Sequence, residues 1–264
     1  MKRDSPRISS KLLKHRLLTT DPELIKYLPA MSSYSKVNLR SMLQRYGMVY
    51  IKPDTGSMGN GIIRVEVRKG TYNLHSGDRN ITYSSFERLV FGLKRHVKHR
   101  QHLIQQGIHV LKYEKRPYDF RVMIQRSPSG KWVPTGTAGR VAPPGLAVTN
   151  GSQGGTIYAA DELLRHTAGI RKTSHLLKQM NRIAKQTSSV FASKYPLMNE
   201  LGLDVAIDKQ FKLWILEVNT RPDPCPFTKL SDHTLITRII AYGKGYGRSY
   251  CLRCGKARSA KVHK

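Results

Sequence analysis

Three side chains in the C-terminal third of the chain could together bind a divalent cation. Asp204 lies in the run 203–208, and Glu217 and Asn219 lie in the run 214–222. Both runs are typical of β-strands and a turn-like segment joins them, so the stretch predicts a β-hairpin. Because side chains alternate along a strand, Glu217 and Asn219 should share a face, with Asp204 close by on the partner strand. Two carboxylates and an amide suit Mg²⁺ or Mn²⁺, but two ordinary strands with outward polar residues explain this stretch equally well.

A lysine followed by several glycines could bind phosphate. Lys52 lies near the end of a predicted strand at 48–53, a glycine-rich loop follows at 56–61, and a second strand is expected at 62–67. Glycines let a backbone approach phosphate oxygens and direct N–H groups at them, as in a flap that covers a nucleotide. The loop is not a Walker loop, because no Gly-Lys-Ser/Thr follows and the next element is a strand. The alternative is a structural hairpin with a surface lysine.

Two arginines lie on a second predicted hairpin. Arg121 belongs to a strand at 119–125, and Arg140 belongs to its partner at 132–142. If both reach one cleft, their paired N–H donors could bind a phosphate or a carboxylate. Each of them taken alone is more often a surface arginine.

Composition restricts the classes of partner. The chain of 264 residues carries 46 Lys and Arg against 17 Asp and Glu, a net charge of +29 that attracts polyanions. No nucleic-acid readout module is recognisable, so nucleic acid is not the favoured partner. No apolar run is long enough to span a membrane, and the N-terminus lacks the apolar core of a secretory signal.

The cysteines predict a reducing compartment. Three cysteines are too few for a disulfide framework, so the cytoplasm is the expected location. Cys251 and Cys254 form a lone CxxC without the second ligand pair that a zinc site needs.

The elements that must position these residues follow in order. Residues 1–35 predict a basic, loosely held arm with a short helix after Asp21 and no visible chemistry. Helices are expected at 36–46, after Ser84 or Ser85, across 161–195 and around 235–240. From about 243 the chain is basic and rich in glycine, which favours a disordered tail.

Taken in order, these motifs resemble the ATP-grasp superfamily and, more closely, the YheC/YheD group of endospore coat-associated proteins. The resemblance covers about residues 36–242. Its motifs are Tyr50–Pro53 with Gly56–Gly61, Gln105–Ile108, Asp119–Val122, Gly139–Val141, Thr149-Asn150 with Gly154-Gly155, and Asp204 with Glu217–Pro222.

The resemblance implies an α+β ATP-grasp fold, in which two α+β subdomains clasp ATP. We expect the first subdomain at 46–108 and the second at 109–242, between an arm at 1–35 and a tail at 243–264. ATP-grasp enzymes usually carry a preceding domain that helps to bind the acceptor, and too few residues precede the core here to form it. We therefore expect the acceptor site to be reduced or supplied by a partner.

The resemblance also assigns roles to the candidate residues. Lys52 would contact the α- and β-phosphates, and the loop Gly56, Ser57, Met58, Gly59 and Gly61 would close over the triphosphate. The adenine would meet a hinge strand, and one or two Mg²⁺ ions (or Mn²⁺) would be held by Asp204, Glu217 and Asn219. The hinge residues are Gln105, Gln106 and Ile108, and the arginines that face the γ-phosphate or the acceptor carboxylate are Arg121, Arg140 and Arg221.

The implied activity is that of an ATP-dependent carboxylate–amine (or similar) ligase that works through an acyl phosphate. Its partners would be ATP and an unidentified carboxylate and amine, with an anionic spore coat or matrix as a further partner. The first alternative is a structural coat-associated protein with a vestigial nucleotide site, and a charge-driven nucleic-acid binder is the second.

Overall fold

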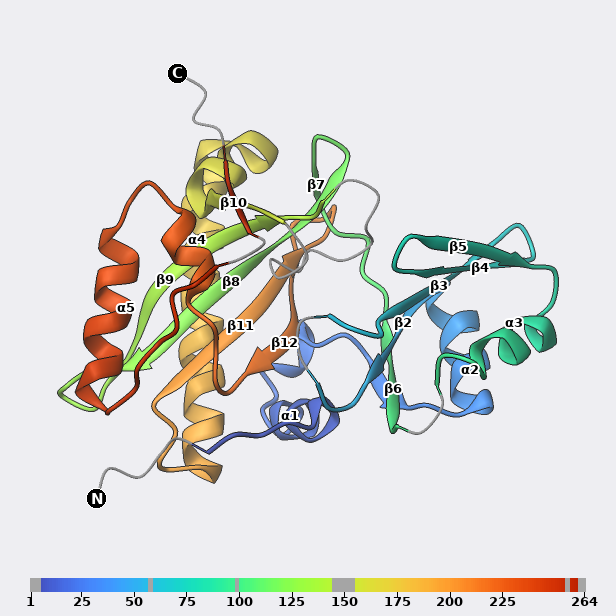
Figure 1. The fold of residues 1–264 in the computed structure, drawn as a ribbon, viewed down its shortest axis with the longest axis horizontal. Coiled ribbons are helices and arrows are strands. Elements are labelled where there is room, and N and C mark those ends of the chain that lie inside the picture. The colour runs from blue at the N-terminus through green and yellow to red at the C-terminus, as the bar shows by residue number, and fades with distance from the viewer. Residues whose placement is uncertain (1–5, 57–58, 98–99, 144–154, 255–256, 261–264) are drawn as a thin grey trace.

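The computed structural model describes residues 6–56, 59–97, 100–143, 155–254 and 257–260, which form two β-sheets with helices packed on them (Figure 1). This confirms the α+β class predicted from the sequence. In the part of the chain so described, no helix is both long and apolar enough to cross a membrane.

The first sheet contains six antiparallel strands in the order β1-β6-β2-β3-β4-β5. Helices α2 (Lys36–Tyr46) and α3 (Phe86–Leu93) pack on it and close its core. Both helices begin as predicted, with a serine hydroxyl accepting a hydrogen bond from a backbone N–H of the first turn. The strands are β1 (Met31–Ser33), β2 (Met48–Pro53), β3 (Ile63–Arg68), β4 (Thr71–Ser76), β5 (Arg79–Tyr83) and β6 (His102–Gln106).

The second sheet has the order β12-β11-β8-β9-β10-β13, and the short β7 pairs with β8. All its neighbours are antiparallel except β10 and β13. Its strands are β7 (Lys112–Tyr113), β8 (Arg116–Arg126), β9 (Trp132–Val141), β10 (Thr156–Ala159), β11 (Glu200–Ile207), β12 (Leu213–Asn219) and β13 (Arg258–Ser259). The predicted hairpins of β8 with β9 and of β11 with β12 are confirmed.

The two faces of the second sheet have different covers. Helix α4 (Ala160–Lys194) packs on one face, while α5 (Thr234–Gly245) and the 3₁₀ turn η3 (Cys225–Lys229) pack on the other. Along β8, Val122 and Ile124 belong to the α4 core, whereas Met123 belongs to the α5 core. Side chains alternate along a strand, so Arg121 points to the same side as Met123. One face of the sheet therefore carries the α5 core at one end and the charged residues at the other.

Helix α4 is not continuous, although the sequence predicts one long helix. Gly169 has φ 75° and ψ 165°, which breaks the helix in its first third. Glycine is the residue that adopts this backbone conformation at low cost. The predicted core stripe around Met180 and Ile183 is buried in the longer second part.

The N-terminal arm is packed against the core, and its predicted looseness is wrong for the described residues 6–35. A short helix is present after Asp21 as predicted, as the 3₁₀ turn η1 (Ile25–Tyr27), and it is preceded by α1 (Lys11–Leu18), which was not predicted. Leu18, Leu24 and Leu28 are buried in the larger core. The apolar residues in this basic segment therefore act as anchors.

The C-terminal tail is likewise ordered where it is described, contrary to the prediction of disorder. Glu200 at the start of β11 is buried, and its carboxylate accepts hydrogen bonds from the hydroxyls of Tyr246 and Tyr250 at 3.0 and 2.5 Å. Arg248 forms an ion pair with the same carboxylate at 3.1 Å. Burial raises the pKa of Glu200, and the hydrogen bonds and Arg248 oppose that rise only in part.

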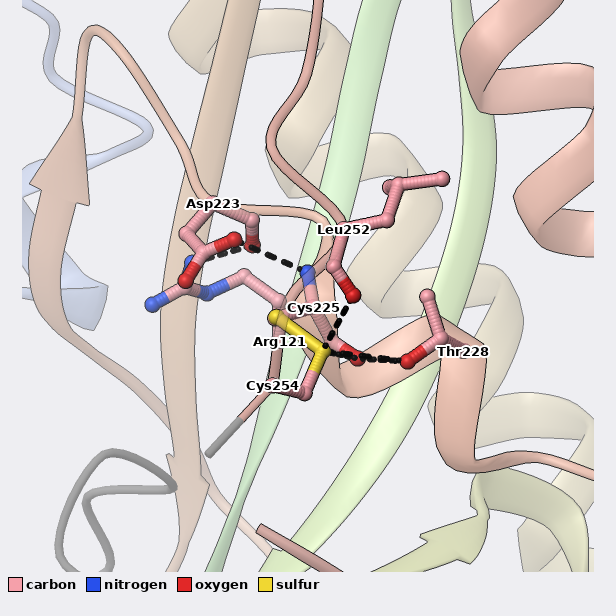
Figure 2. Close-up of a disulfide and its surroundings, with 6 residues drawn as sticks. All are labelled: Arg121, Asp223, Cys225, Thr228, Leu252 and Cys254. Carbon is pink, nitrogen blue, oxygen red and sulfur yellow. Dashed lines mark hydrogen bonds between the residues drawn. A yellow bond between two sulfur atoms is a disulfide. The ribbon is translucent and has the colours of Figure 1, made fainter. Parts of the chain in front are cut away.

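A disulfide between Cys225 and Cys254 closes the tail onto the segment after β12 (Figure 2). The sequence did not predict this pairing, because the CxxC spacing drew attention to Cys251, which is free and exposed. The Cys225 N–H donates to the Asp223 carboxylate, and the Asp223 carbonyl accepts from the Arg121 guanidinium at 3.5 Å. The disulfide thus holds a loop that contacts the charged end of the sheet.

We predict that Cys254→Ser lowers the free energy of unfolding by about 2–4 kcal/mol, because the cross-link closes a loop of about 30 residues in the unfolded chain. Cys251→Ser is the matched control and should leave stability unchanged. Chemical denaturation without reductant measures both variants, and peptide mapping of the unreduced protein checks the pairing. Equal stability of the two variants would contradict a bond between Cys225 and Cys254.

The raised pKa of Glu200 predicts a pH-dependent stability. Its folded pKa lies above the unfolded value of about 4.3, so between these values the native state binds more protons and stability falls as the pH rises. Glu200→Gln should flatten the slope of unfolding free energy against pH in the acid range above pH 4.3. The measurement is urea denaturation at a series of pH values, with Glu162→Gln, at an exposed position of α4, as control.

Candidate functional site

A cleft between the two sheets gathers most of the residues singled out in the sequence. It encloses a cavity of about 150 Å³, and the wider empty space of about 1100 Å³ around it includes open solvent. Its described lining consists of Lys11, Tyr50, Lys52, Pro53, Thr55, Gly56, Gly59, Asn60, Ile62, Gln105, Gln106, Ile108, Val110, Pro117, Tyr118, Asp119, Arg121, Arg140, Asp204, Leu216, Glu217 and Asn219. The cleft draws on β2, the glycine loop, β6, β8, β9, β11 and β12.

Strand register brings the charged residues together at the second sheet. Asp204 on β11 lies opposite Arg121 of β8 on one side and opposite Glu217 of β12 on the other. Directly opposed side chains on neighbouring strands lie within contact distance. A register shift follows Asp204 in the pairing with β12, and Asn219 lies two residues beyond Glu217, on the same face. The predicted neighbourhood of Asp204, Glu217 and Asn219 is thus present.

Two arginines and two aspartates form a buried network beside these ligand candidates. Arg140 binds Asp119 through two hydrogen bonds of 2.7 Å and forms an ion pair with Asp204 at 3.1 Å. Arg121 donates from Nε to Asp204 at 2.7 Å. Asp119, Arg121 and Arg140 are all less than 9% exposed. Asp119 belongs to the motif 119–122 recognised in the sequence but was assigned no role there, and its position two residues before Arg121 on one strand was the available signal.

The network determines the charge state of its members. Burial alone would raise the pKa of Asp204, but the charges and hydrogen bonds of Arg121 and Arg140 outweigh it and leave the pKa lowered. Burial would lower the pKa of Arg140, yet Asp119 and Asp204 raise it further above its ordinary value. Asp204 and Arg140 are therefore both charged at neutral pH.

Lys52 lies at the centre of the cleft wall formed by the first sheet. Its ammonium donates to the Gln105 side chain at 2.5 Å, and the Gln105 amide donates to the Leu216 carbonyl of β12 at 3.0 Å. Gln105 thus connects the two sheets across the cleft. Burial lowers the pKa of Lys52, and the charge of Glu217 opposes this shift.

The other hinge residues lie beside Gln105. The Gln106 side chain accepts from the Ala30 N–H at 3.1 Å, which directs it toward the arm, and Ile108 lines the cleft.

The glycine loop joins β2 to β3 at the edge of the cleft. Gly56, Gly59 and Gly61 have φ values of 114°, 71° and 74°, a region that other residues rarely adopt. A side chain at Gly61 would also approach the Pro53 ring within 3.2 Å. Ser57 and Met58 lie outside the described residues. The predicted strand, glycine turn and strand are confirmed.

Helix α1 contributes two cations that the sequence did not reveal. The Lys11 ammonium lines the cleft and donates to the carbonyls of Pro53 and Gly56 at 3.1 and 3.0 Å, at the base of the glycine loop. Lys14 is buried and lies 3.7 Å from a carboxylate oxygen of Glu217. The available signal was Ser10, a helix N-cap directly before the first of these lysines.

Arg221 does not join the other arginines. It is exposed just after β12 and is not among the described residues that line the cleft. Its charge acts instead on buried Glu200, whose pKa it lowers slightly against the effect of burial. Its assigned role toward a phosphate or acceptor stays a prediction.

The donor set fits a hard divalent cation that is bound together with phosphate. Asp204, Glu217 and Asn219 all line the cleft. The amide nitrogen of Asn219 donates to the Gly202 carbonyl at 3.4 Å, which leaves its amide oxygen, the atom that a metal would bind. Within the described ranges no group of three or more His, Cys, Asp or Glu side chains is arranged to hold a metal. Mg²⁺ takes about six oxygen ligands, so three side chains would leave positions for phosphate oxygens or water.

A family model for YheC/D-like ATP-grasp proteins matches residues 4–248 of the sequence. The chain belongs to this family. The match includes α1 and the first residues of the tail, up to residue 248, which lie beyond the region of resemblance recognised from motifs.

The chain is similar in sequence to two proteins from Bacillus subtilis (strain 168). The chain is 29% identical over 226 residues to the endospore coat-associated protein YheD, covering 83% of this chain and 49% of the relative. It is 25% identical over 205 residues to the endospore coat-associated protein YheC, covering 76% and 54%. The chain thus spans about half the length of these relatives.

Among solved structures, the fold is similar to that of N5-carboxyaminoimidazole synthase from Aspergillus clavatus, whose structure contains ADP and 5-aminoimidazole ribonucleotide. The TM-score is 0.55 with 10% sequence identity, over 96% of this chain and 54% of that one. This likeness concerns the fold, and it confirms the predicted ATP-grasp architecture with two sheets.

The buried network predicts a large effect of removing one member. Arg140→Leu should lower the free energy of unfolding by about 3–5 kcal/mol, since it removes a buried cation that binds both Asp119 and Asp204. Arg165→Leu removes an exposed arginine paired with Asp161 at the surface of α4 and should cost less than about 1 kcal/mol. Urea denaturation compares the two variants, and similar losses would show that the buried pairs carry no special stability.

Proposed function

We propose that this chain binds ATP with Mg²⁺ (or Mn²⁺) in the cleft and acts as an ATP-dependent ligase of the carboxylate–amine type. One observation carries the proposal: Lys52 and the glycine loop face Asp204, Glu217 and Asn219 across a single cleft. Phosphoryl transfer depends mainly on positioning and on neutralising charge, and this cleft offers cations and metal ligands rather than a protein nucleophile.

The residues divide the work by position. Lys52 and Lys11 place positive charge beside the glycine loop, where the phosphates would lie. The loop backbone would cover the phosphates, and β6 with Ile108 would border the adenine. Arg121 and Arg140 are already bound to carboxylates, so they present the remaining N–H donors in a fixed orientation to the γ-phosphate or to an acceptor carboxylate.

A divalent cation held by Asp204, Glu217 and Asn219 would neutralise charge that develops on the phosphate oxygens. In the proposed reaction a substrate carboxylate oxygen bonds to the γ-phosphorus and the bond to ADP breaks, which leaves an acyl phosphate. An amine then bonds to the acyl carbon and inorganic phosphate leaves. The acceptor and the amine are unidentified, and an anionic coat or matrix would be a further partner of this basic chain.

The second candidate is a structural coat-associated protein that keeps the cleft without turnover. The names of the two Bacillus subtilis relatives favour it, and so does the pairing of Asp119, Asp204 and Glu217 with protein cations. Nucleotide binding is common to both candidates, and phosphate release separates them.

Calorimetric titration with a non-hydrolysable ATP analogue tests the binding. The wild-type chain should bind it in a Mg²⁺-dependent manner, and Glu217→Gln should weaken that binding at least about tenfold, the effect typical of losing even an indirect support of a metal ligand. Glu162→Gln, at an exposed position of α4, is the matched control and should bind the analogue as tightly as wild type. Binding that does not depend on Mg²⁺, or that is unchanged in Glu217→Gln, would contradict the proposal.

A phosphate-release screen with carboxylate and amine pairs tests the activity. Release that depends on a particular pair and is lost in Lys52→Met would support the ligase. Nucleotide binding without release for any pair would favour the structural candidate.

A further inference from the structure

Helix α1 presses a buried lysine against the candidate metal strand. Lys14 is only 6% exposed, and its ammonium lies 3.7 Å from Oε1 of Glu217. Figure 1 shows α1 beside β12, between the two sheets. Lysine is almost never buried without a partner, so the carboxylate of Glu217 accounts for its position.

Lys14 meets Glu217 from outside the cleft. It lines a small cavity between α1 and β12 that adjoins the cleft and shares Lys11 and Lys52 with it. The other walls of this cavity include the apolar residues Leu18, Ile215 and Val218. Glu217 lines both this cavity and the cleft, whereas Lys14 is not among the described residues that line the cleft. The two charged groups therefore meet through the wall of the site.

Contacts around α1 hold this lysine in place. The backbone N–H of Lys11 donates to the Asp54 carbonyl, and that of Leu12 donates to the Asp54 carboxylate, at 2.9 and 2.8 Å. Just before the helix, the Ile8 N–H donates to the Thr220 hydroxyl at 3.0 Å. The helix is thus fastened to the base of the glycine loop and to the residue that follows β12.

Among the described residues that line the cleft, three are carboxylates, and all of them have protein cations as partners. Asp119 and Asp204 are paired with the arginines, and Glu217 with Lys14. A divalent cation that coordinates Glu217 would lie within a few ångströms of Lys14, and their repulsion would weaken its binding. A nucleotide that binds together with the cation brings negative charge, so the net interaction of Lys14 with the metal–nucleotide complex becomes attractive.

We propose that Lys14 is a positioning residue for Glu217. Its ammonium holds the Glu217 carboxylate from the α1 side, so that the site binds a divalent cation together with the nucleotide rather than the cation alone. The inference rests on the proposed function, because it assumes that Glu217 is a metal ligand.

The test titrates Mn²⁺, followed by the electron paramagnetic resonance of the free ion, with and without a non-hydrolysable ATP analogue. Lys14→Met keeps the apolar stem and removes the charge, and Lys14→Arg keeps the charge. Lys178→Met, on the exposed surface of α4, makes the same change of net charge far from the site. Thermal unfolding of each variant checks that it folds.

We expect Lys14→Met to bind Mn²⁺ alone more tightly than wild type, on the order of tenfold for a unit charge about 6 Å from a divalent ion in water. With the nucleotide analogue its gain should disappear or become a loss. Lys14→Arg and Lys178→Met should behave as wild type in both titrations. A merely structural role for Lys14 would instead weaken both kinds of binding alike.

Two failures can be told apart. A wild-type chain that shows no metal-dependent nucleotide binding would overturn the proposed function and this inference with it. Wild-type binding with Lys14→Met indistinguishable from Lys178→Met, or weakened in both titrations, would overturn the role of Lys14 alone. A Lys14→Met chain that does not fold leaves Lys14→Arg decisive, because tighter binding of Mn²⁺ alone by that variant contradicts the inference.

Discussion

The cleft depends on one physical constraint, which is that charges buried at the second sheet must neutralise one another. Asp204 can face the cleft as a carboxylate only because Arg121 and Arg140 offset the cost of taking it out of water. Asp119 in turn holds Arg140 in orientation through two hydrogen bonds. Antiparallel register supplies these contacts without a loop, so the charged groups are held on rigid strands.

The same face of this sheet serves two purposes. At one end it presents the charged network to the cleft, and at the other it buries Met123 and Gln125 beneath α5 and the tail. Glu200 and Asp204 share that face of β11, one held by tail tyrosines and one by arginines. The disulfide between Cys225 and Cys254 links the tail covalently to the loop after β12, and this loop contacts Arg121 at the charged end.

The N-terminal arm changes how the site is understood. It supplies Lys11 beside the glycine loop and Lys14 behind Glu217, so the cations around the cleft come from both sheets and from α1. The net charge of +29 is thus not only a surface property. Part of it is used inside the site, where every carboxylate that lines the cleft has a cation as its partner.

Residue types and order alone determined the family, the α+β class, the two central hairpins and most of the cleft lining, because strand periodicity and the glycine turn are local signals. The position of Lys14, the pairing of Asp119 with Arg140 and the bond between Cys225 and Cys254 were decided only by the tertiary structure. Each depends on a partner far away in the chain, and nothing local to a basic helix or a lone CxxC specifies that partner. The predictions of a loose arm and a disordered tail failed for the same reason: composition measures charge, whereas burial depends on which surface a few leucines and tyrosines can reach.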